Sequence, residues 1–239
     1  MGLRERFPET SWTLLARACK QCDEGARARE DFAQRYYRPV QEFLSVLVQD
    51  AEQAQDLAQE FFARLLEGNW LAKADRQRGR FRSFLLSAMK HFMANEWNKS
   101  RAQKRGGGQP ILSLNDDSAE HRYRLEPAEK ATPESLYERG WALTLLEGVL
   151  ARLEDEYRLE GKQAWWESMR PALTTDRGAI VYQEMAQDLG ITETAARVAV
   201  HRLRQRYRQL IRAEVAGTVA SPEEVDEEMH HLFQVLTDG

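Results

Sequence analysis

Arginines recur through residues 194–213 at intervals that place several of them on one side of a helix. The segment carries six arginines and no acidic residue, so its charge is not balanced locally. A guanidinium group is a permanent, planar cation that can bind a phosphate or donate two hydrogen bonds to the edge of a guanine. The chemistry predicted here is binding to a polyanion. The alternative is an ordinary helical hairpin with a basic, solvated face.

The residues before and within this segment predict the element that would present it to DNA. A short amphipathic stretch ends at Gly190, which can adopt a positive φ, and Thr192 is placed to cap a second helix. Two helices joined by such a turn form a helix-turn-helix, whose second helix fits the major groove. Arg197, near its start, is expected to read guanine edges, and the later arginines to bind phosphates. The candidate duplex-binding residues are Thr192, Thr194, Arg197, His201, Arg204 and Arg208.

A second basic segment, residues 76–105, predicts a different nucleic-acid contact. Nine lysines and arginines stand against the single acid Glu96, and aromatic and amide side chains lie among them. Separated strands need cations for their phosphates and flat side chains for their unstacked bases. The loop before the helix could form the wall of a pocket for an extruded base. The candidate residues are Arg76, Arg78, Arg80, Lys90, His91, Asn95 and Trp97.

A third feature is an acidic helix face. Asp56, Gln59, Glu60 and Ala63 fall on the side of a predicted helix, residues 51–66, that lies away from its apolar stripe. Carboxylates do not attract DNA, so this face has another partner or only water. Two carboxylates four residues apart could be half of a metal site, but no Glu-x-x-His or second carboxylate pair completes one.

No catalytic, metal or cofactor site is predicted. Cys19 and Cys22 have the spacing of half a zinc site or of a redox pair, but no second cysteine pair supplies four ligands. Two ordinary cysteines on an N-terminal helix are the alternative. The sequence contains no glycine-rich phosphate loop and no convincing pair of nucleophile and base. We therefore expect a binding protein and not an enzyme.

The elements that position these side chains are all predicted to be helices. Apolar residues have helical spacing from Phe32, through residues 51–66 and 81–98, and again from Trp141. Three glycines and Pro110 end the first helical block, and a polar, acidic, aperiodic stretch follows. The predicted class is all-α, with two small helical domains, a flexible linker and an amphipathic C-terminal helix. The predicted division is an N-terminal extension 1–24, a first domain 25–105, an acidic linker 106–135, a helix-turn-helix domain 136–212 and an acidic tail 213–239.

The acidic tail has two interpretations. Ser221 and Pro222, with Glu224, predict a capping box at the start of an amphipathic helix. Such a helix usually completes the core of the domain beside it. Alternatively the tail, with seven acids and no lysine or arginine, folds over a basic DNA-binding face and restrains the free protein.

Composition excludes other classes of protein. The chain of 239 residues has a net charge of −4, but that average hides two basic segments and the acidic tail. No apolar run is long enough for a membrane helix, and the first residues lack the apolar segment of a secretory signal. Two cysteines cannot staple a secreted scaffold. We expect no membrane insertion and a cytoplasmic location.

These motifs, in this order, resemble the bacterial sigma-70 family of RNA polymerase sigma factors, specifically its two-domain extracytoplasmic-function type. Residues 56–65 resemble the family segment D-L-x-Q-E-x-F-x-R-L. Residues 80–92 are similar to its F-R-x-W-L…A-R-N helix, with Ser83-Phe84 in place of Ala-Trp and His91 in place of Arg. Residues 186–204 resemble its closing helix-turn-helix. The insertion at 154–181 and the tail have no counterpart in this pattern.

The resemblance implies a role for each segment. The helix carrying Asp56, Gln59 and Glu60 would bind the clamp helices of the polymerase largest subunit. Residues 81–99 and the preceding loop would open and hold the −10 promoter element, and residues 182–212 would read the −35 element. Core RNA polymerase and promoter DNA are then the partners, and an anti-sigma factor or other regulator is a further partner that the resemblance leaves open. The alternative is a stand-alone helix-turn-helix regulator that binds duplex DNA.

Overall fold

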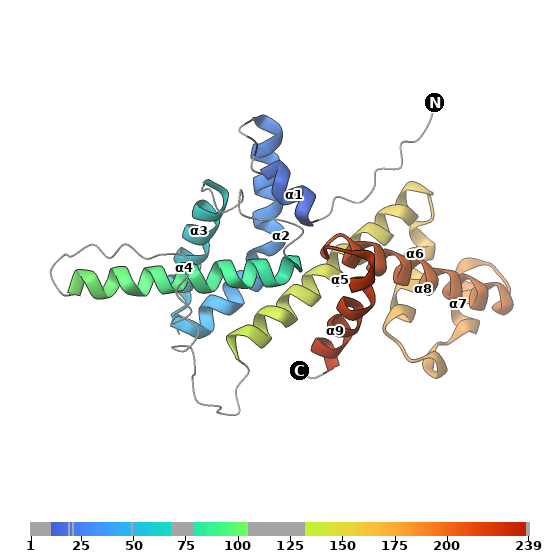
Figure 1. Ribbon diagram of the computed structural model, residues 1–239. Helices are drawn as coiled ribbons and strands as arrows, with labels where there is room; N and C mark the ends of the chain where they lie inside the picture. The colour runs from blue at the N-terminus through green and yellow to red at the C-terminus, as the bar shows by residue number, and fades with distance from the viewer. Residues whose placement is uncertain are drawn as a thin grey trace. The chain divides into compact units, whose positions relative to one another are not determined.

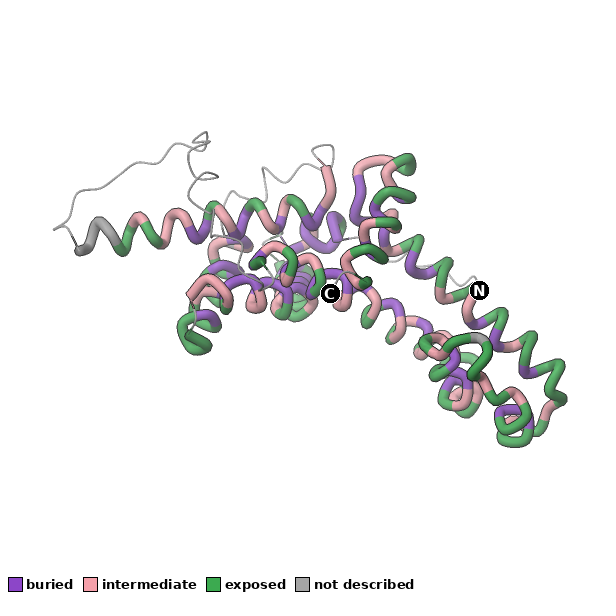
Figure 2. The backbone as a smooth tube through the Cα atoms, turned by 90° about the horizontal axis from the view of Figure 1, so that it is seen from below, coloured by how far each residue is buried: buried purple, intermediate pink, exposed green. Residues whose placement is uncertain are grey.

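The computed structural model describes residues 11–18, 20, 22–48, 50–67, 79–104 and 132–237, and every regular element in them is a helix (Figure 1). The all-α prediction is confirmed. The α-helices are α1 (Ser11–Ala18), α2 (Asp23–Val48), α3 (Ala51–Glu67), α4 (Phe81–Lys104), α5 (Pro133–Leu159), α6 (Gln163–Met169), α7 (Tyr182–Leu189), α8 (Glu193–Ala216) and α9 (Val225–Thr237). Along these helices buried and exposed residues alternate, as amphipathic helices require (Figure 2).

Contacts divide the described residues into two compact units. One contains residues 11–141 together with residues 235–237, and the other contains residues 142–234. The division therefore falls inside α5, between Trp141 and Ala142. The first turns of α5 belong to the unit of α1–α4, although the predicted boundary between domains lies in the linker 106–135. Most of that linker lies outside the described residues.

The core of the first unit is aromatic. The predicted stripe of α2 is buried at Phe32, Tyr36 and Phe43, and each of these side chains is at most 2% exposed. Phe32 makes ring contacts with Phe62 of α3 and Phe81 of α4, at centroid distances of 6.2 and 6.1 Å. Such contacts add specific ring geometry to the burial of a large apolar area. They fix α2, α3 and α4 against one another.

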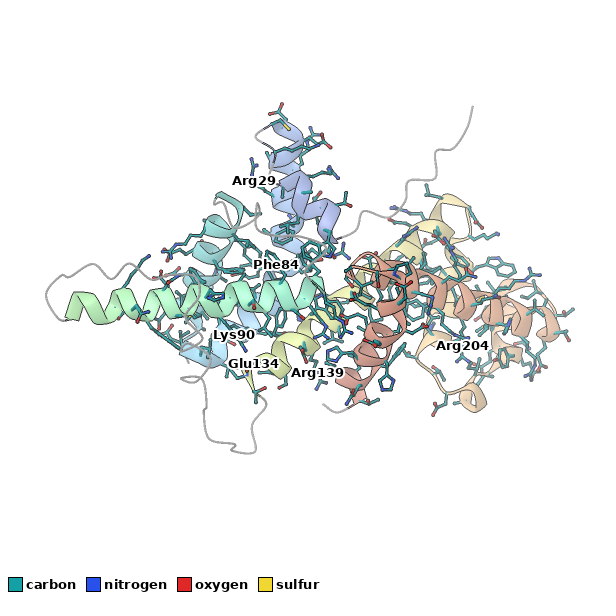
Figure 3. All side chains as sticks on the ribbon, viewed as in Figure 1. Arg29, Phe84, Lys90, Glu134, Arg139 and Arg204 are labelled. Carbon is teal, nitrogen blue, oxygen red and sulfur yellow. The ribbon has the colours of Figure 1, made fainter. Side chains whose placement is uncertain are left out.

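Helix α1 belongs to this core, although the sequence placed it in an N-terminal extension. The Trp12 ring meets Phe81 edge-on at 5.1 Å, and the Tyr36 hydroxyl donates a hydrogen bond to Ser11 Oγ at 2.6 Å. At the end of α1, the Arg29 guanidinium donates to the carbonyl oxygens of Ala18 and Lys20 at 3.1 and 3.0 Å (Figure 3). These bonds satisfy carbonyls that the helix end would otherwise leave without partners.

The cysteine pair can be followed only in part. Cys22 is an exposed free thiol, and Cys19 lies outside the described residues. Within the described residues, no three His, Cys, Asp or Glu side chains gather where they could hold a metal ion. In the same part of the chain, no helix is both long enough and apolar enough to cross a membrane.

The start of the tail helix differs from the predicted capping box. Pro222–Glu224 form a 3-10 turn, and α9 begins only at Val225. The Glu224 carboxylate accepts a hydrogen bond from the Ala220 amide at 3.0 Å instead of reaching back to Ser221. Val225, Glu228 and Leu232 are buried. The tail therefore packs as an amphipathic helix, in accordance with the first of its two interpretations.

Candidate nucleic-acid interfaces

The outer side of α4 carries side chains predicted to bind separated strands. His91 is exposed, Asn95 is half-buried, and Trp97 is 39% exposed. Met89 and Phe92, on the inner side, are buried. An imidazole, an amide and an indole therefore project outward from a helix that the aromatic core holds in place. Flat aromatic and amide groups on a rigid support are suited to unstacked bases.

Lys90 and Arg80, two cations beside this surface, are less exposed than its histidine and tryptophan rings. Lys90 Nζ forms an ion pair with Glu134 Oε1 of α5 at 3.0 Å, so the lysine is half-buried (Figure 3). Arg80 lies immediately before α4 and is also half-buried. Arg76 and Arg78 lie outside the described residues. Lys90 was expected to face DNA, and in the free protein its charge is instead balanced within the chain.

An ion-pair network joins α3 to α4. Glu96 Oε1 accepts from Arg64 Nη1 at 2.6 Å and from Lys99 Nζ at 3.0 Å, and Arg64 also pairs with Glu60. The Arg64 guanidinium lies over the Phe92 ring, 5.2 Å from its centroid. Burial disfavours the charged form of Glu96, but the hydrogen bonds from Lys99 and Arg64 outweigh it and lower its pKa. The single acid of the basic segment is thus a structural residue.

The acidic face of α3 is placed as predicted. Asp56, Gln59, Glu60 and Ala63 are all exposed. The apolar side of the same helix is buried at Phe61, Phe62 and Leu65. The sequence did not identify Arg64, which is half-buried and links Glu60 to α4. Its position four residues after Glu60 was the available signal.

In the second unit, α7 and α8 are joined by a tight turn with the predicted geometry. Gly190 has φ +64°, a left-handed conformation that glycine adopts without strain. The Thr192 side chain accepts a hydrogen bond from the Ala195 amide at 3.2 Å and so caps α8. Thr192, Thr194 and His201 are exposed. The turn and the cap therefore fix the exposed start of α8 relative to α7.

Arg197 is exposed, and its guanidinium group has two partners in the described residues. Its guanidinium bonds the Glu193 carboxylate, with Nη2 2.6 Å from Oε1, and lies over the Tyr182 ring at 4.4 Å from the centroid. Both partners belong to the same helix pair. A surface ion pair of this kind is worth little in water, so it orients Arg197 without holding it firmly.

Arg204 does not have the placement expected of a phosphate contact. Its Nε and Nη2 donate to the carbonyl oxygen of Ala172 at 2.9 and 2.6 Å, and Nη2 also donates to that of Thr175 at 2.7 Å (Figure 3). Arg206 forms a two-point pair with Glu156 of α5, at 2.8 and 2.6 Å. These two arginines hold α8 to the insertion 154–181. Their donors are used inside the unit, which helical spacing alone did not reveal.

A residue that the sequence analysis missed lies among the exposed cations. Val198 is 45% exposed, and it is four residues after Thr194 and three before His201. Residues at these spacings share one helix face. A β-branched apolar side chain outside the apolar stripe was the signal that could have identified it. An exposed apolar group on such a face can contact the methyl group of thymine.

An ion pair joins the end of α8 to the tail. Arg212 pairs with Asp226 of α9, and the hydrogen bond between them lowers the pKa of the Asp226 carboxyl and raises that of the arginine. Both side chains are exposed. Arg208, four residues earlier, is exposed as well. The tail therefore neutralises an arginine beyond the predicted base-reading end of α8.

Part of the chain matches a known protein family. Residues 32–103 match the family profile described as Sigma-70 region 2, which spans most of α2, all of α3 and nearly all of α4. Comparisons with curated proteins and with solved structures give no match. The match covers the helices that bear the acidic face of α3 and the aromatic face of α4. Residues 32–103 are therefore similar to region 2 of the sigma-70 family of RNA polymerase sigma factors, and this similarity supports a role in promoter recognition and polymerase binding.

Proposed function

We propose that this protein is a sigma factor of the two-domain extracytoplasmic-function type and acts in the cytoplasm. It binds core RNA polymerase through α3, opens and holds the −10 element on α4, and reads the −35 element with α8. The observation that carries the proposal is the family match at residues 32–103, because it unites the acidic α3 face and the aromatic α4 face in one unit. The protein contributes recognition, and the polymerase performs the phosphoryl transfer.

The polymerase-binding surface in this proposal is the exposed face of α3. Asp56 and Glu60 supply negative charge, Gln59 supplies an amide, and Ala63 leaves room for close approach. Such a face is complementary to a basic helix pair, which matches the clamp helices implied by the family resemblance. Charge complementarity would orient the factor during docking and exclude wrong partners.

The −10 surface is the outer side of α4 with the loop before it. Trp97 and His91 offer rings on which unstacked bases can stack, and Asn95 offers donors and an acceptor for base edges. Arg76, Arg78 and Arg80 would bind the phosphates of the same strand. This combination of rings and cations suits a single strand, because the bases of a closed duplex are stacked on one another and cannot stack on a protein ring.

The −35 surface is the exposed start of α8, held as the second helix of a helix-turn-helix. Thr192 and Thr194 lie where the amino end of a recognition helix approaches the groove, and Arg197 would read a guanine. His201 and Arg208 follow on the same side and would meet phosphates. Val198 is added to this set, and Arg204 is assigned to the support of the insertion instead.

The decisive experiment is reconstitution of the full chain with bacterial core polymerase on a randomised promoter library. The expected result is transcription that depends on the added chain. The transcribed promoters should share two sequence motifs that are separated by at least one helical turn of DNA. Trp97→Ala should reduce strand separation at the −10 element without reducing the affinity for core polymerase. Binding to duplex DNA without any association with core polymerase would overturn the proposal and favour a stand-alone regulator.

A further inference from the structure

The first nine residues of α5 dock on the surface of α2 and α4. Pro133, Tyr137 and Trp141 recur every fourth residue and are buried, so one side of this segment faces the unit. The Tyr137 hydroxyl donates a hydrogen bond to the carbonyl oxygen of Arg82 at 3.0 Å. Thr132 caps the helix by accepting from the Ser135 amide at 3.1 Å. The segment 133–141 is therefore a defined helical start, seated by specific contacts.

A glycine permits the seating. A Cβ atom at Gly140 would lie 2.3 Å from Glu42 Oε2 and 3.1 Å from the Cα atom of Pro39, both on α2. Any side chain at this position would have to displace the carboxylate and press on the backbone of α2. On the same helix, Gly148 has no atom within 4 Å of such a Cβ. A substitution at Gly140 should therefore disturb the docking of the segment on α2. The same substitution at Gly148 should report only the general effect on the helix.

The docked segment also carries two carboxylates that meet the cations of α4. Glu134 pairs with Lys90 at 3.0 Å, and Glu138 pairs with Arg82 Nη1 at 2.7 Å. The two glutamates are four residues apart, on one side of the helix. The Arg82 side chain is only 9% exposed beneath the segment. Two negative groups thus pair with two cations of α4, and one of these, Lys90, belongs to the residues predicted to bind the separated strand; Lys90 and Glu134 are labelled in Figure 3.

We propose that residues 133–141 are a reversible acidic latch that competes with single-stranded DNA for Lys90 and Arg82. The proposal rests on the function assigned to α4 above. A cation that pairs with a carboxylate cannot at the same time bind a phosphate, so the two glutamates stand where two phosphates of the strand would lie. The Lys90–Glu134 pair is about one-third exposed and therefore weak, so a strand with many phosphates can displace it; Arg82 is reached only once the segment has left. The free factor then holds single strands poorly until the latch opens.

The first test removes the charges of the latch. The double substitution Glu134→Gln with Glu138→Gln is made in the full chain, and binding to a fluorescein-labelled 20-nucleotide oligo(dT) is measured from low to physiological salt. We expect about two- to fivefold tighter binding at low salt, the size expected from freeing Lys90, the cation of the two that is already partly exposed. The slope of log affinity against log salt should steepen by about 0.7, since Lys90 gains one phosphate contact and each such contact on a single strand contributes about 0.7. The matched control is Glu147→Gln with Glu154→Gln, which changes the charge of α5 equally.

The second test opens the latch without changing any charge. Gly140→Gln should unseat the segment, whereas Gly148→Gln should not, although both gain a good helix former. Amide hydrogen exchange of residues 133–141 reports the latch itself and does not depend on DNA. We expect faster exchange in this segment and tighter oligo(dT) binding for Gly140→Gln, with both unchanged for Gly148→Gln. This variant also decides the matter if the double glutamine variant does not fold.

The outcomes separate the latch from the proposed function. Faster exchange at residues 133–141 with unchanged oligo(dT) affinity and salt slope, while Trp97→Ala still weakens binding, would overturn the latch and leave the −10 surface intact. Equal gains in the Glu147/Glu154 control would also overturn it, because net charge would then explain the effect. Failure of Trp97→Ala and His91→Ala to alter binding would overturn both the α4 surface and the latch.

Discussion

The basic helices α4 and α8 use their cations in different ways. On α4, Lys90 and Arg82 are balanced by carboxylates from the start of α5, and the exposed side chains among residues 81–100 include His91, Trp97 and Lys99 beside three serines. On α8, Arg197 and Arg208 are exposed, while Arg204 on one flank binds carbonyl oxygens and Arg206 on the other flank binds Glu156. A count of basic residues therefore does not give the number of cations that face solvent on either helix.

The physical reason lies in the guanidinium group. Arginine carries five donors on a long stem, so it can satisfy carbonyls or carboxylates of its own chain as well as a phosphate. The Lys90 ammonium group can likewise pair with a carboxylate of its own chain or with a phosphate. Which partner an individual cation meets depends on the element packed beside it. On α8 the arginines that meet such neighbours, Arg204 and Arg206, lie on opposite flanks, and Arg197 and Arg208 stay exposed.

The largest expected effect is a loss of polymerase binding that leaves DNA binding by α8 unchanged. Glu60→Lys should weaken binding to core polymerase by about 2–3 kcal/mol, because it places like charge against a basic partner. The binding of α8 to a −35 duplex should not change. Titration of labelled factor with core polymerase measures the first quantity, and duplex binding the second. Asp31→Lys, a charge reversal of the same size at an exposed position of α2, is the charge control, and equal losses in both variants would argue against a specific α3 interface.

Arg204 tests the division of α8 into supporting and exposed cations. Arg204→Ala leaves the carbonyl oxygens of Ala172 and Thr175 without the donors they now have, which should cost about 2 kcal/mol of unfolding free energy. Arg208→Ala, on the exposed side, should stay within about 0.5 kcal/mol of the parent protein. Urea unfolding, with hydrogen exchange at residues 170–176, measures both. Unchanged stability with weaker DNA binding in Arg204→Ala would return this residue to the DNA surface.

Arg197 and Arg208 test the direction of readout along α8. Arg197→Ala should lose about 1–2 kcal/mol against its preferred base and little against other bases, because a bidentate contact carries sequence information. Arg208→Ala should weaken all −35 sequences alike and flatten the salt dependence by about one phosphate contact. Binding to a set of single-base variants at two salt concentrations distinguishes the two patterns. A uniform loss in Arg197→Ala would mean that another turn of α8 reads the bases.

The smallest effect concerns Glu96, the acid that α4 keeps for structure. Because its pKa is lowered in the folded protein, the ionised carboxylate stabilises the fold above its ordinary pKa of 4.5. That contribution is lost as the pH falls through the lowered pKa. Glu96→Gln should therefore cost less than about 1 kcal/mol at neutral pH, and the difference from the parent should shrink in acid. Denaturant titrations at several pH values measure it, and a pH-independent difference would contradict the network.

Periodicity in the sequence was enough to predict every long helix of the two helical blocks. The apolar stripe of α2, the exposed acidic side of α3 and the turn at Gly190 follow from local rules of spacing, capping and φ. Thr192 caps α8 as predicted because its side chain needs only the next turn of the same helix. Helix α1 was not assigned to the core, because its partner Phe81 is distant in the sequence.

The sequence by itself determined which residues are helical, which of their sides are apolar and where charge accumulates. Only the tertiary structure decided which charges remain available. Lys90 meets Glu134 across 44 positions of the chain, and Arg204 meets Ala172 across 32, so no local pattern could pair them. Helical spacing reports the side of the helix on which a cation lies. It does not report the neighbour that packs against that side, because the neighbour is set by burial of apolar surface far away in the chain.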